Sequence, residues 1–146
     1  MKRPKMLIAV SLLAAWLVLP PCAGAKSPDP DAVRDVIRTK VESLQRGNTV
    51  RIAGADLTPW QPLPALYGAA DYQARWTKPE GIDDFVAAIR ESVEDGLEPG
   101  DFHLDAIERL RKEHRGDAES VADLDLLLSD ALARFGYQMR FGKVDP

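Results

Sequence analysis

Side chains that could carry catalysis are few in this chain, and none has the spacing that a familiar reaction requires. The 146 residues include one cysteine, Cys22, and two histidines, His103 and His114. We find no motif for a serine nucleophile, a zinc hydrolase or a phosphate-binding loop. A metal site or an acid–base pair needs partners at matching spacing, so each histidine is predicted to be structural or solvated. We expect no catalytic residue, no cofactor and no metal ion.

The acidic clusters could suggest two kinds of chemistry, a cation site and a pair of glycosidase carboxylates. Asp123, Asp125 and Asp130 could suggest a cation site, but calcium takes six to eight oxygens and these helical positions do not converge. They are predicted to lie on a solvated helix face. The carboxylate pairs at 83–84 and 94–95 do not form a glycosidase dyad, because neighbouring residues of a helix do not face each other across a substrate.

The aromatic residues allow two interpretations, stacking on sugar rings of a cell-wall polymer or packing in a core. Aromatic side chains dominate the cores of small domains, so packing is the favoured prediction. The residues concerned are Trp60, Tyr67, Tyr72, Trp76, Phe102 and Tyr137.

The N-terminal segment has the pattern of a secretory signal peptide over residues 1–25. Basic residues precede an apolar run at 6–19, two prolines follow, and Ala23 and Ala25 form a small-x-small cleavage site. This pattern predicts cleavage after Ala25 and a periplasmic protein. The polar, proline-containing stretch 26–30 is predicted to be a disordered lead-in.

Two alternatives to cleavage remain for this segment. An uncleaved membrane anchor needs to cross about 30 Å of hydrocarbon, whereas the apolar run would span only about 21 Å as a helix. A lipoprotein would be acylated on Cys22, but two prolines directly precede that residue. The main prediction is therefore a soluble periplasmic protein with no stable membrane span.

Charge and cysteine content exclude several other classes. The formal net charge is −4, and the basic residues of the signal segment leave the rest more acidic still. A nucleic-acid partner is not expected, since phosphate binding needs a concentrated basic face. After residue 25 the chain has no cysteine, so neither thiolate chemistry nor a disulfide is open to it. Apolar burial must then hold the fold together.

Hydrophobic spacing predicts a mainly α fold, a small helical domain of about five helices after the signal peptide. Asp29 and Pro30 suit the start of the first helix, and Gly96 suits a helix end that needs a left-handed residue. Residues 50–52 are at most a short extended piece. The predicted helices fall near 31–46, 65–70, 82–95, 104–115 and 120–141.

The longest predicted helix carries a broad apolar face. That breadth indicates contact with several neighbours at once. Its predicted face comprises Val121, Leu124, Leu128, Leu132, Phe135 and Met139, widened by Leu127 and Ala131.

Four segments together resemble the N-terminal scaffold domain of the large periplasmic L,D-transpeptidases. They are Leu66 to Trp76, the corner Asp95 to Phe102 with the sequence DGLEPGDF, Leu124 to Ala131, and the final RFGKVDP at 140–146. The segments occur in the family's order, and the resemblance covers nearly all of residues 31–146. The resemblance therefore implies that 31–146 is a helical scaffold domain.

In that family, the scaffold precedes and surrounds a peptidoglycan-binding insert and a catalytic domain that cross-links wall peptides through a cysteine. The family's Ser-His-Gly-Cys-x-Arg segment has no counterpart here, so no catalytic residue is carried over. The resemblance implies a scaffold domain truncated before the catalytic cysteine domain and not an enzyme on its own. A freestanding periplasmic adapter that binds a partner protein or the wall, and a gene fragment with no independent role, are the alternatives.

A candidate interface follows from this resemblance. A scaffold without its catalytic half should leave an apolar surface uncovered, and such surfaces mark interaction sites. Phe135, Met139 and Phe141, near the end of the last predicted helix, are the candidate residues. Their expected partner is a separately encoded catalytic or wall-binding protein, or a second copy of the chain. The alternative is that they fold back on their own domain.

Overall fold

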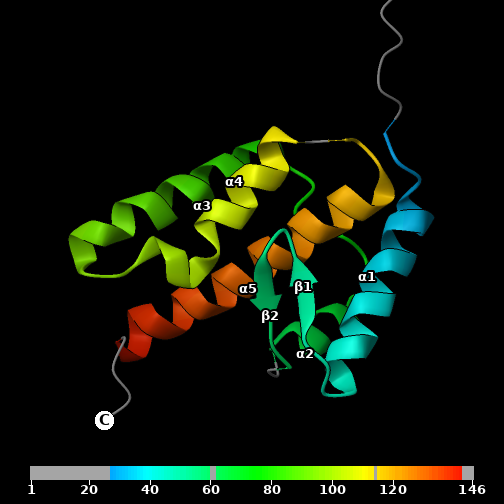
Figure 1. Cartoon of the computed structure of the whole chain (residues 1–146), viewed down its shortest axis with the longest axis horizontal. Coiled ribbons are helices and arrows are strands. Elements are labelled where there is room, and N and C mark those ends of the chain that lie inside the picture. Colours follow the sequence, from blue (N-terminus) through cyan, green and yellow to red (C-terminus); the bar gives the residue numbers. More distant parts are fainter. Residues whose placement is uncertain (1–26, 60–61, 114, 143–146) are drawn as a thin grey trace, which may run out of the picture.

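The computed structural model describes residues 27–59, 62–113 and 115–142, and within them the chain is mainly α-helical (Figure 1). Five α-helices, two 3₁₀ helices and one β-hairpin are present in these ranges, which confirms the predicted fold class. The predicted signal peptide, with Ala23 and Ala25, lies outside the described residues. The elements are α1 (Pro30–Gln45), β1 (Val50–Ile52), β2 (Ala55–Leu57), α2 (Pro62–Gly68), α3 (Pro79–Glu91), η1 (Ser92–Asp95), η2 (Pro99–Phe102), α4 (Leu104–Lys112) and α5 (Ala118–Phe141).

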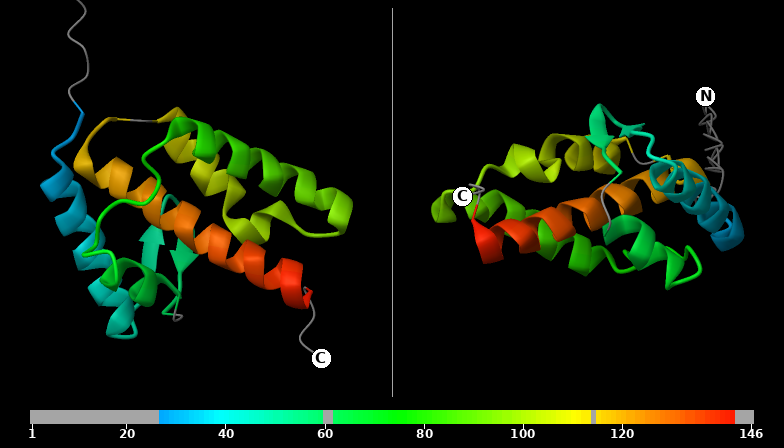
Figure 2. Two further views of the ribbon diagram at one scale, coloured as in Figure 1. Left: turned by 180° about the vertical axis from the view of Figure 1, so that it is seen from behind. Right: turned by 90° about the horizontal axis from the view of Figure 1, so that it is seen from below.

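Helix α5 is the central element of the fold. It packs against α1, α2, α4 and η2, which come from all parts of the preceding chain. Figure 2 shows α5 between the hairpin on one face and α2 on the other. No described helix is both long and apolar enough to cross a membrane.

Helix α1 forms as its sequence predicts. The side chain of Asp29 accepts a hydrogen bond from the Asp31 amide, and Pro30 occupies the first turn, where its missing N–H costs nothing. Its buried residues recur every three or four positions and face the core: Val33, Ile37, Val41 and Leu44.

The predicted helix end at Gly96 is also confirmed. The α-helical part of α3 stops at Glu91 and continues as the 3₁₀ helix η1 up to Asp95. Gly96 then adopts φ +77°, the left-handed conformation that glycine enters without steric cost. The Leu97 amide donates to the Ser92 carbonyl at 3.0 Å, so the last turn is closed by the chain that follows it.

The hairpin was only half predicted, since β1 was expected as an extended piece and β2 was not. Ala53 and Gly54 both have positive φ, 47° and 86°, as a tight two-residue hairpin turn requires. The strand residues Ile52 and Leu57 are buried. Arg109 of α4 donates to the Ala53 carbonyl in the turn at 2.8 Å. The turn is therefore held against α4.

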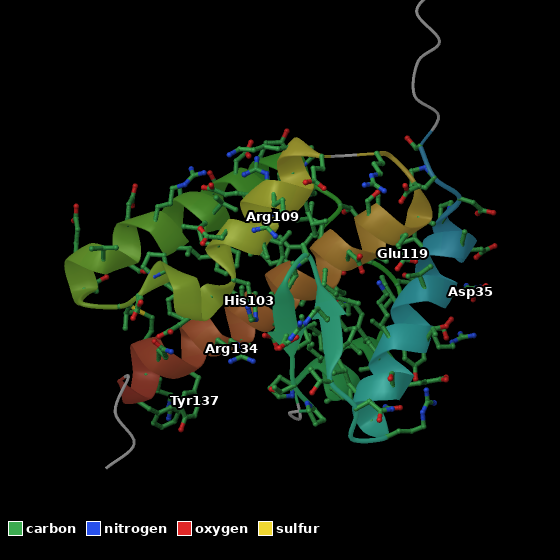
Figure 3. The ribbon with its side chains drawn as sticks, in the orientation of Figure 1. Asp35, His103, Arg109, Glu119, Arg134 and Tyr137 are labelled. Atoms are coloured by element: carbon green, nitrogen blue, oxygen red, sulfur yellow. The ribbon has the colours of Figure 1, made fainter. Side chains whose placement is uncertain are left out.

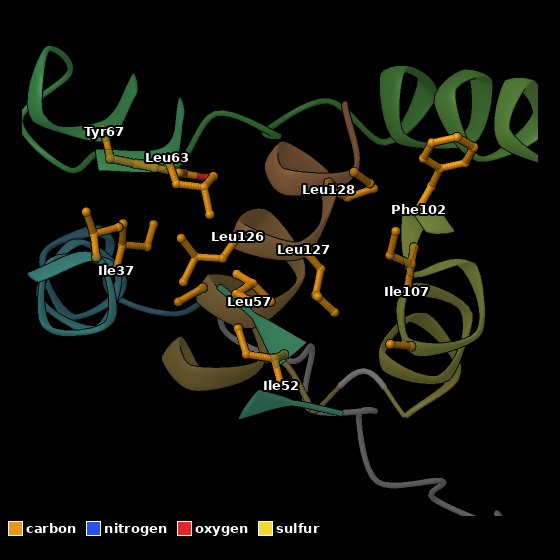
Figure 4. Close-up of a cluster of buried hydrophobic side chains, with 14 of the residues drawn as sticks. Ile37, Ile52, Leu57, Leu63, Tyr67, Phe102, Ile107, Leu126, Leu127 and Leu128 are labelled. Carbon is orange, nitrogen blue, oxygen red and sulfur yellow. The ribbon is translucent and has the colours of Figure 1, made fainter. Parts of the chain in front are cut away.

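The predicted face of the longest helix was wrong at Leu132 and Met139, whereas Phe135 is partly buried as predicted. Burial is continuous from Asp125 to Ala131 instead of following one stripe, because neighbours surround this part of α5. In Figure 4, Leu126 lies toward Ile37 and Leu63, whereas Leu128 lies toward Phe102. Beyond Ala131 the cover is incomplete: Phe135 packs against Phe85 and Phe102, whereas Leu132 and Met139 are exposed.

Candidate functional site

A buried carboxylate organises the centre of the molecule. Oδ1 of Asp125 accepts a hydrogen bond from the Tyr67 hydroxyl at 2.5 Å. Oδ2 of Asp125 accepts from the backbone amides of Arg75 and Trp76, each at 2.8 Å. One side chain of α5 thus fixes both α2 and the segment that connects α2 to α3.

Ser129 extends this network by one helical turn. Its hydroxyl lies 2.8 Å from the Tyr67 hydroxyl and accepts from the Trp76 indole N–H at 3.0 Å. The Trp76 ring also stacks on Phe85 of α3, with centroids 5.3 Å apart. Polar and aromatic contacts therefore place the 69–78 segment against α5 in one defined position.

The prediction that Asp125 and Asp130 lie on a solvated face was wrong, since both are buried. Hydrogen-bond donors from other elements surround them, and these contacts between distant segments cannot be read from local spacing. Burial raises the pKa of Asp125, an effect that its hydrogen bonds from Tyr67 and two amides partly oppose. Asp123 is half-buried and forms an ion pair with Lys40 of α1, which also contacts Glu119 at 2.6 Å.

A second buried carboxylate, Asp130, connects α5 to the η2–α4 junction. Its Oδ2 lies 2.7 Å from Nε2 of His103 and accepts from Nε of Arg134 at 2.6 Å. Figure 3 shows His103 and Arg134 next to each other along α5. His103 has φ +59° and begins α4, so the contact holds a left-handed residue at a helix start. That His103 is only structural stays a prediction, and His114 lies outside the described residues.

The geometry of these groups suits positioning more than chemistry. Tyr67 and Ser129 are buried, so a substrate cannot reach either hydroxyl, and burial raises the pKa of Tyr67 far above its usual range. Within residues 27–59, 62–113 and 115–142, no group of three or more His, Cys, Asp or Glu side chains could hold a metal ion. The network fixes helices relative to one another.

The aromatic residues are divided between core and surface. Tyr67 and Phe102 are buried, which confirms the core prediction for both. Tyr72 is partly buried beneath the Arg38 guanidinium, whose carbon lies 5.1 Å from the ring centroid. Tyr137 is exposed, so the core prediction was wrong there. Trp60 lies outside the described residues.

The three candidate interface residues have different surroundings. Phe135 packs edge-on against Phe85 and Phe102, at centroid distances of 6.0 and 5.3 Å, and so belongs to the partly buried margin of the core. Met139 and Phe141 are exposed. Whether any of the three contacts a partner stays a prediction.

Two further apolar residues are exposed on the same part of α5 and were not among the predicted interface residues. The exposed fractions are 48% for Leu132, 51% for Tyr137, 55% for Met139 and 60% for Phe141. Leu132 and Met139 lie on the predicted stripe, whereas Tyr137 and Phe141 lie on the opposite side of the helix. We call Tyr137 and Phe141 the α5 end surface. Tyr137 and Phe141 are four residues apart, and their ring centroids are separated by 4.9 Å. Their i, i+4 spacing, on the side of the helix opposite the predicted stripe, is the sequence pattern that could have predicted this exposed pair.

The family described as Scaffold domain matches residues 61–146, more than half of the chain. The chain belongs to this Scaffold domain family. No curated protein and no solved structure matches it.

The matched region contains every residue of the two buried carboxylate networks. It runs from α2 to beyond α5 and so includes Tyr67, Trp76, His103, Asp125 and Asp130. Helix α1 and the hairpin precede the matched region, yet both pack in the same core as the Scaffold domain elements. Helix α5 thus packs against α1, which precedes the matched region, as well as against elements within that region.

Proposed function

We propose that this chain is the scaffold domain of an L,D-transpeptidase-like protein associated with peptidoglycan cross-linking, and that it supplies a platform instead of catalytic groups. The Scaffold domain match carries this proposal. The segments at 66–76, 95–102, 124–131 and 140–146 support the more specific assignment to the transpeptidase type.

The geometry is well suited to a rigid platform. Asp125 and Asp130 are both buried on α5 and connect it to α2, to the 69–78 segment and to the start of α4. Buried polar networks whose members are satisfied restrict a core to one arrangement. A partner that binds such a domain meets a surface that is already ordered, which lowers the entropic cost of association.

The α5 end surface is the proposed docking site for a catalytic or wall-binding partner. Tyr137 and Phe141, which are 51% and 60% exposed, lie one turn apart near the end of α5, with ring centroids 4.9 Å apart. Exposed apolar side chains that lie side by side are typical of protein interfaces. We further propose that the protein acts in the periplasm after cleavage behind Ala25; intact-mass measurement of protein from the cell envelope tests this, and a species retaining Cys22 would contradict it.

Activity is tested with the purified chain on muropeptides. We expect no release or exchange of terminal D-alanine above a heat-inactivated control, because residues 26–146 contain no cysteine and the Tyr67 and Ser129 hydroxyls are buried. Turnover above that control would contradict the platform assignment.

Docking is tested by co-sedimentation with wall cross-linking enzymes and with purified peptidoglycan. Phe141→Asp should abolish any complex while leaving the thermal unfolding of the domain unchanged, since Phe141 is exposed. Leu66→Asp on α2 is the matched control, because Leu66 is an exposed apolar residue outside the α5 end surface. Complexes that persist in Phe141→Asp, or that both variants lose equally, would rule out this docking site.

A further inference from the structure

A groove lies on the opposite half of the molecule from the α5 end surface, where α1 and α5 both begin. Its volume is about 440 Å³. The walls come from the start of α1, the 73–77 segment and the first turn of α5. The apolar lining consists of Pro28, Pro30, Val33, Ala74 and Val121, and Gln73 and Thr77 add polar side chains. Such a volume is within the range of sites for small ligands.

Arg34 is the positively charged residue that lines this groove, and one of its N–H groups has no hydrogen-bond acceptor. Its Nη2 contacts Oδ1 of Asp31 at 3.1 Å. Its Nε is buried and has no hydrogen-bond acceptor. Buried charged donors normally have an acceptor, so this unpaired N–H is an unfavourable feature of the arrangement.

Asp31 is a weak partner for this arginine. Its side chain is 74% exposed, and the contact is an i, i+3 ion pair on the surface of α1. Exposed pairs of this kind contribute little to stability, because water competes for both charges. Asp31 can therefore be displaced into solvent at little cost when a better acceptor arrives.

A carboxylate that enters the groove could accept from Nε and Nη2 together. Arginine and carboxylate favour this two-bonded geometry, in which two parallel N–H groups of the guanidinium face two oxygens. The entering group would satisfy the unpaired Nε and replace Asp31 on Nη2. Because Nε is covered in the present arrangement, the guanidinium must turn as Asp31 leaves.

We propose that this groove binds the terminal carboxylate of a short peptide with small apolar side chains, held by Arg34 and in competition with Asp31. The apolar lining suits small aliphatic side chains, and Gln73 and Thr77 can hydrogen-bond to peptide amides. The inference rests on these contacts alone and is independent of the α5 end surface and of the proposed function.

The test uses N-acetyl-trialanine as the free acid and as the C-terminal amide, titrated into the ¹⁵N-labelled chain. The free acid should shift the amide signals of residues 31–34 and 73–77, and the amide-capped peptide should bind about tenfold more weakly or worse, since a charge-assisted pair is lost. Equal binding of the two peptides, or no shift at millimolar free acid, would overturn the proposal.

Three variants sharpen this experiment. Arg34→Gln should weaken binding of the free acid about tenfold or more, and Asp31→Asn should tighten it by removing the competing carboxylate. Arg38→Gln is the matched control, because Arg38 lies one turn further along α1, contacts Asp71 and Tyr72, and does not line the groove. Weaker binding in Asp31→Asn, or equal loss in Arg34→Gln and Arg38→Gln, would contradict the assigned roles.

A last peptide separates a terminal from a side-chain carboxylate. N-acetyl-Ala-Asp-Ala-amide carries its only carboxylate on a side chain. Binding weaker than that of the free trialanine supports recognition of a peptide terminus. Binding as tight as the free acid would overturn the choice of a terminal carboxylate.

Discussion

The Tyr67 hydroxyl donates to the Asp125 carboxylate across 2.5 Å and so joins α2 to α5 through two residues that are 58 positions apart in the sequence. The same carboxylate holds the amides of Arg75 and Trp76. Removing it would leave buried donors without an acceptor, while replacing it by an amide would keep most of the hydrogen bonds. This difference gives the first prediction.

Asp125→Ala should lower the free energy of unfolding by about 2–5 kcal/mol, because each buried donor left unpaired costs about 1–3 kcal/mol. Asp125→Asn should cost much less. The asparagine amide oxygen can accept from the two backbone amides, and its NH₂ can donate to the Tyr67 hydroxyl. The hydroxyl can in turn donate to the backbone carbonyl of residue 125, which lies 3.1 Å from it in the structure. Urea unfolding of both variants tests this, and equal losses would show that the hydrogen bonds are not what Asp125 contributes.

The pH dependence of stability should differ between the wild type and Asp125→Asn. Burial raises the pKa of Asp125, so the folded state keeps its proton at a pH where the unfolded state, with a pKa of about 3.9, has lost it. The stability from this proton is complete below the unfolded pKa and is lost as pH rises through the folded pKa. The wild type should therefore lose stability relative to Asp125→Asn as pH rises from about 4. A relative gain with rising pH would show that the hydrogen bonds outweigh burial.

Two leucines of α5 should respond differently to truncation. Leu128 is buried, and Leu128→Ala should cost about 2–5 kcal/mol through lost burial and the cavity left behind. Leu132 is 48% exposed, and Leu132→Ala should change stability by about 0.5 kcal/mol or less. Similar shifts in melting temperature for the two variants would contradict the end of burial at Ala131.

Two glycines provide a further matched pair. Gly96 has φ +77°, so Gly96→Ala should cost about 1–2 kcal/mol even though no atom lies within 4 Å of the added methyl. Gly136 is exposed within α5 and has equal space, so Gly136→Ala should stabilise the domain by up to about 1 kcal/mol. Chemical denaturation of both variants checks the opposite signs. Changes of the same sign would show that backbone conformation does not govern these positions.

The helices could be predicted because their signals are local. The spacing of Val33, Ile37 and Val41, and the glycine at position 96, depend only on neighbouring residues, and the structure agrees with both. Strand β2 was missed because its three residues carry no periodic pattern of their own. It exists because Ile52 and Leu57 share a buried site below a two-residue turn.

The polar network could not be predicted for a related reason. An aspartate on a helix is usually solvated, and only the approach of Tyr67 and the 69–78 segment makes burial of Asp125 tolerable. The exposed residues of α5 show the converse error. Leu132 continues the apolar stripe in sequence, but no element covers it in space. Local patterns indicate which side chains favour burial and do not show where neighbouring elements end.

The position of α5 in the chain also bears on how the protein folds during synthesis. Earlier elements form separate small groups, such as α1 with α2 and α4 with η2, and these groups meet on α5. Until the ribosome has released residues up to Ala131, their apolar faces have no common partner. The native state is therefore reached late, from contacts distant in sequence, and a nascent chain halted before that point would be exposed to proteases and aggregation.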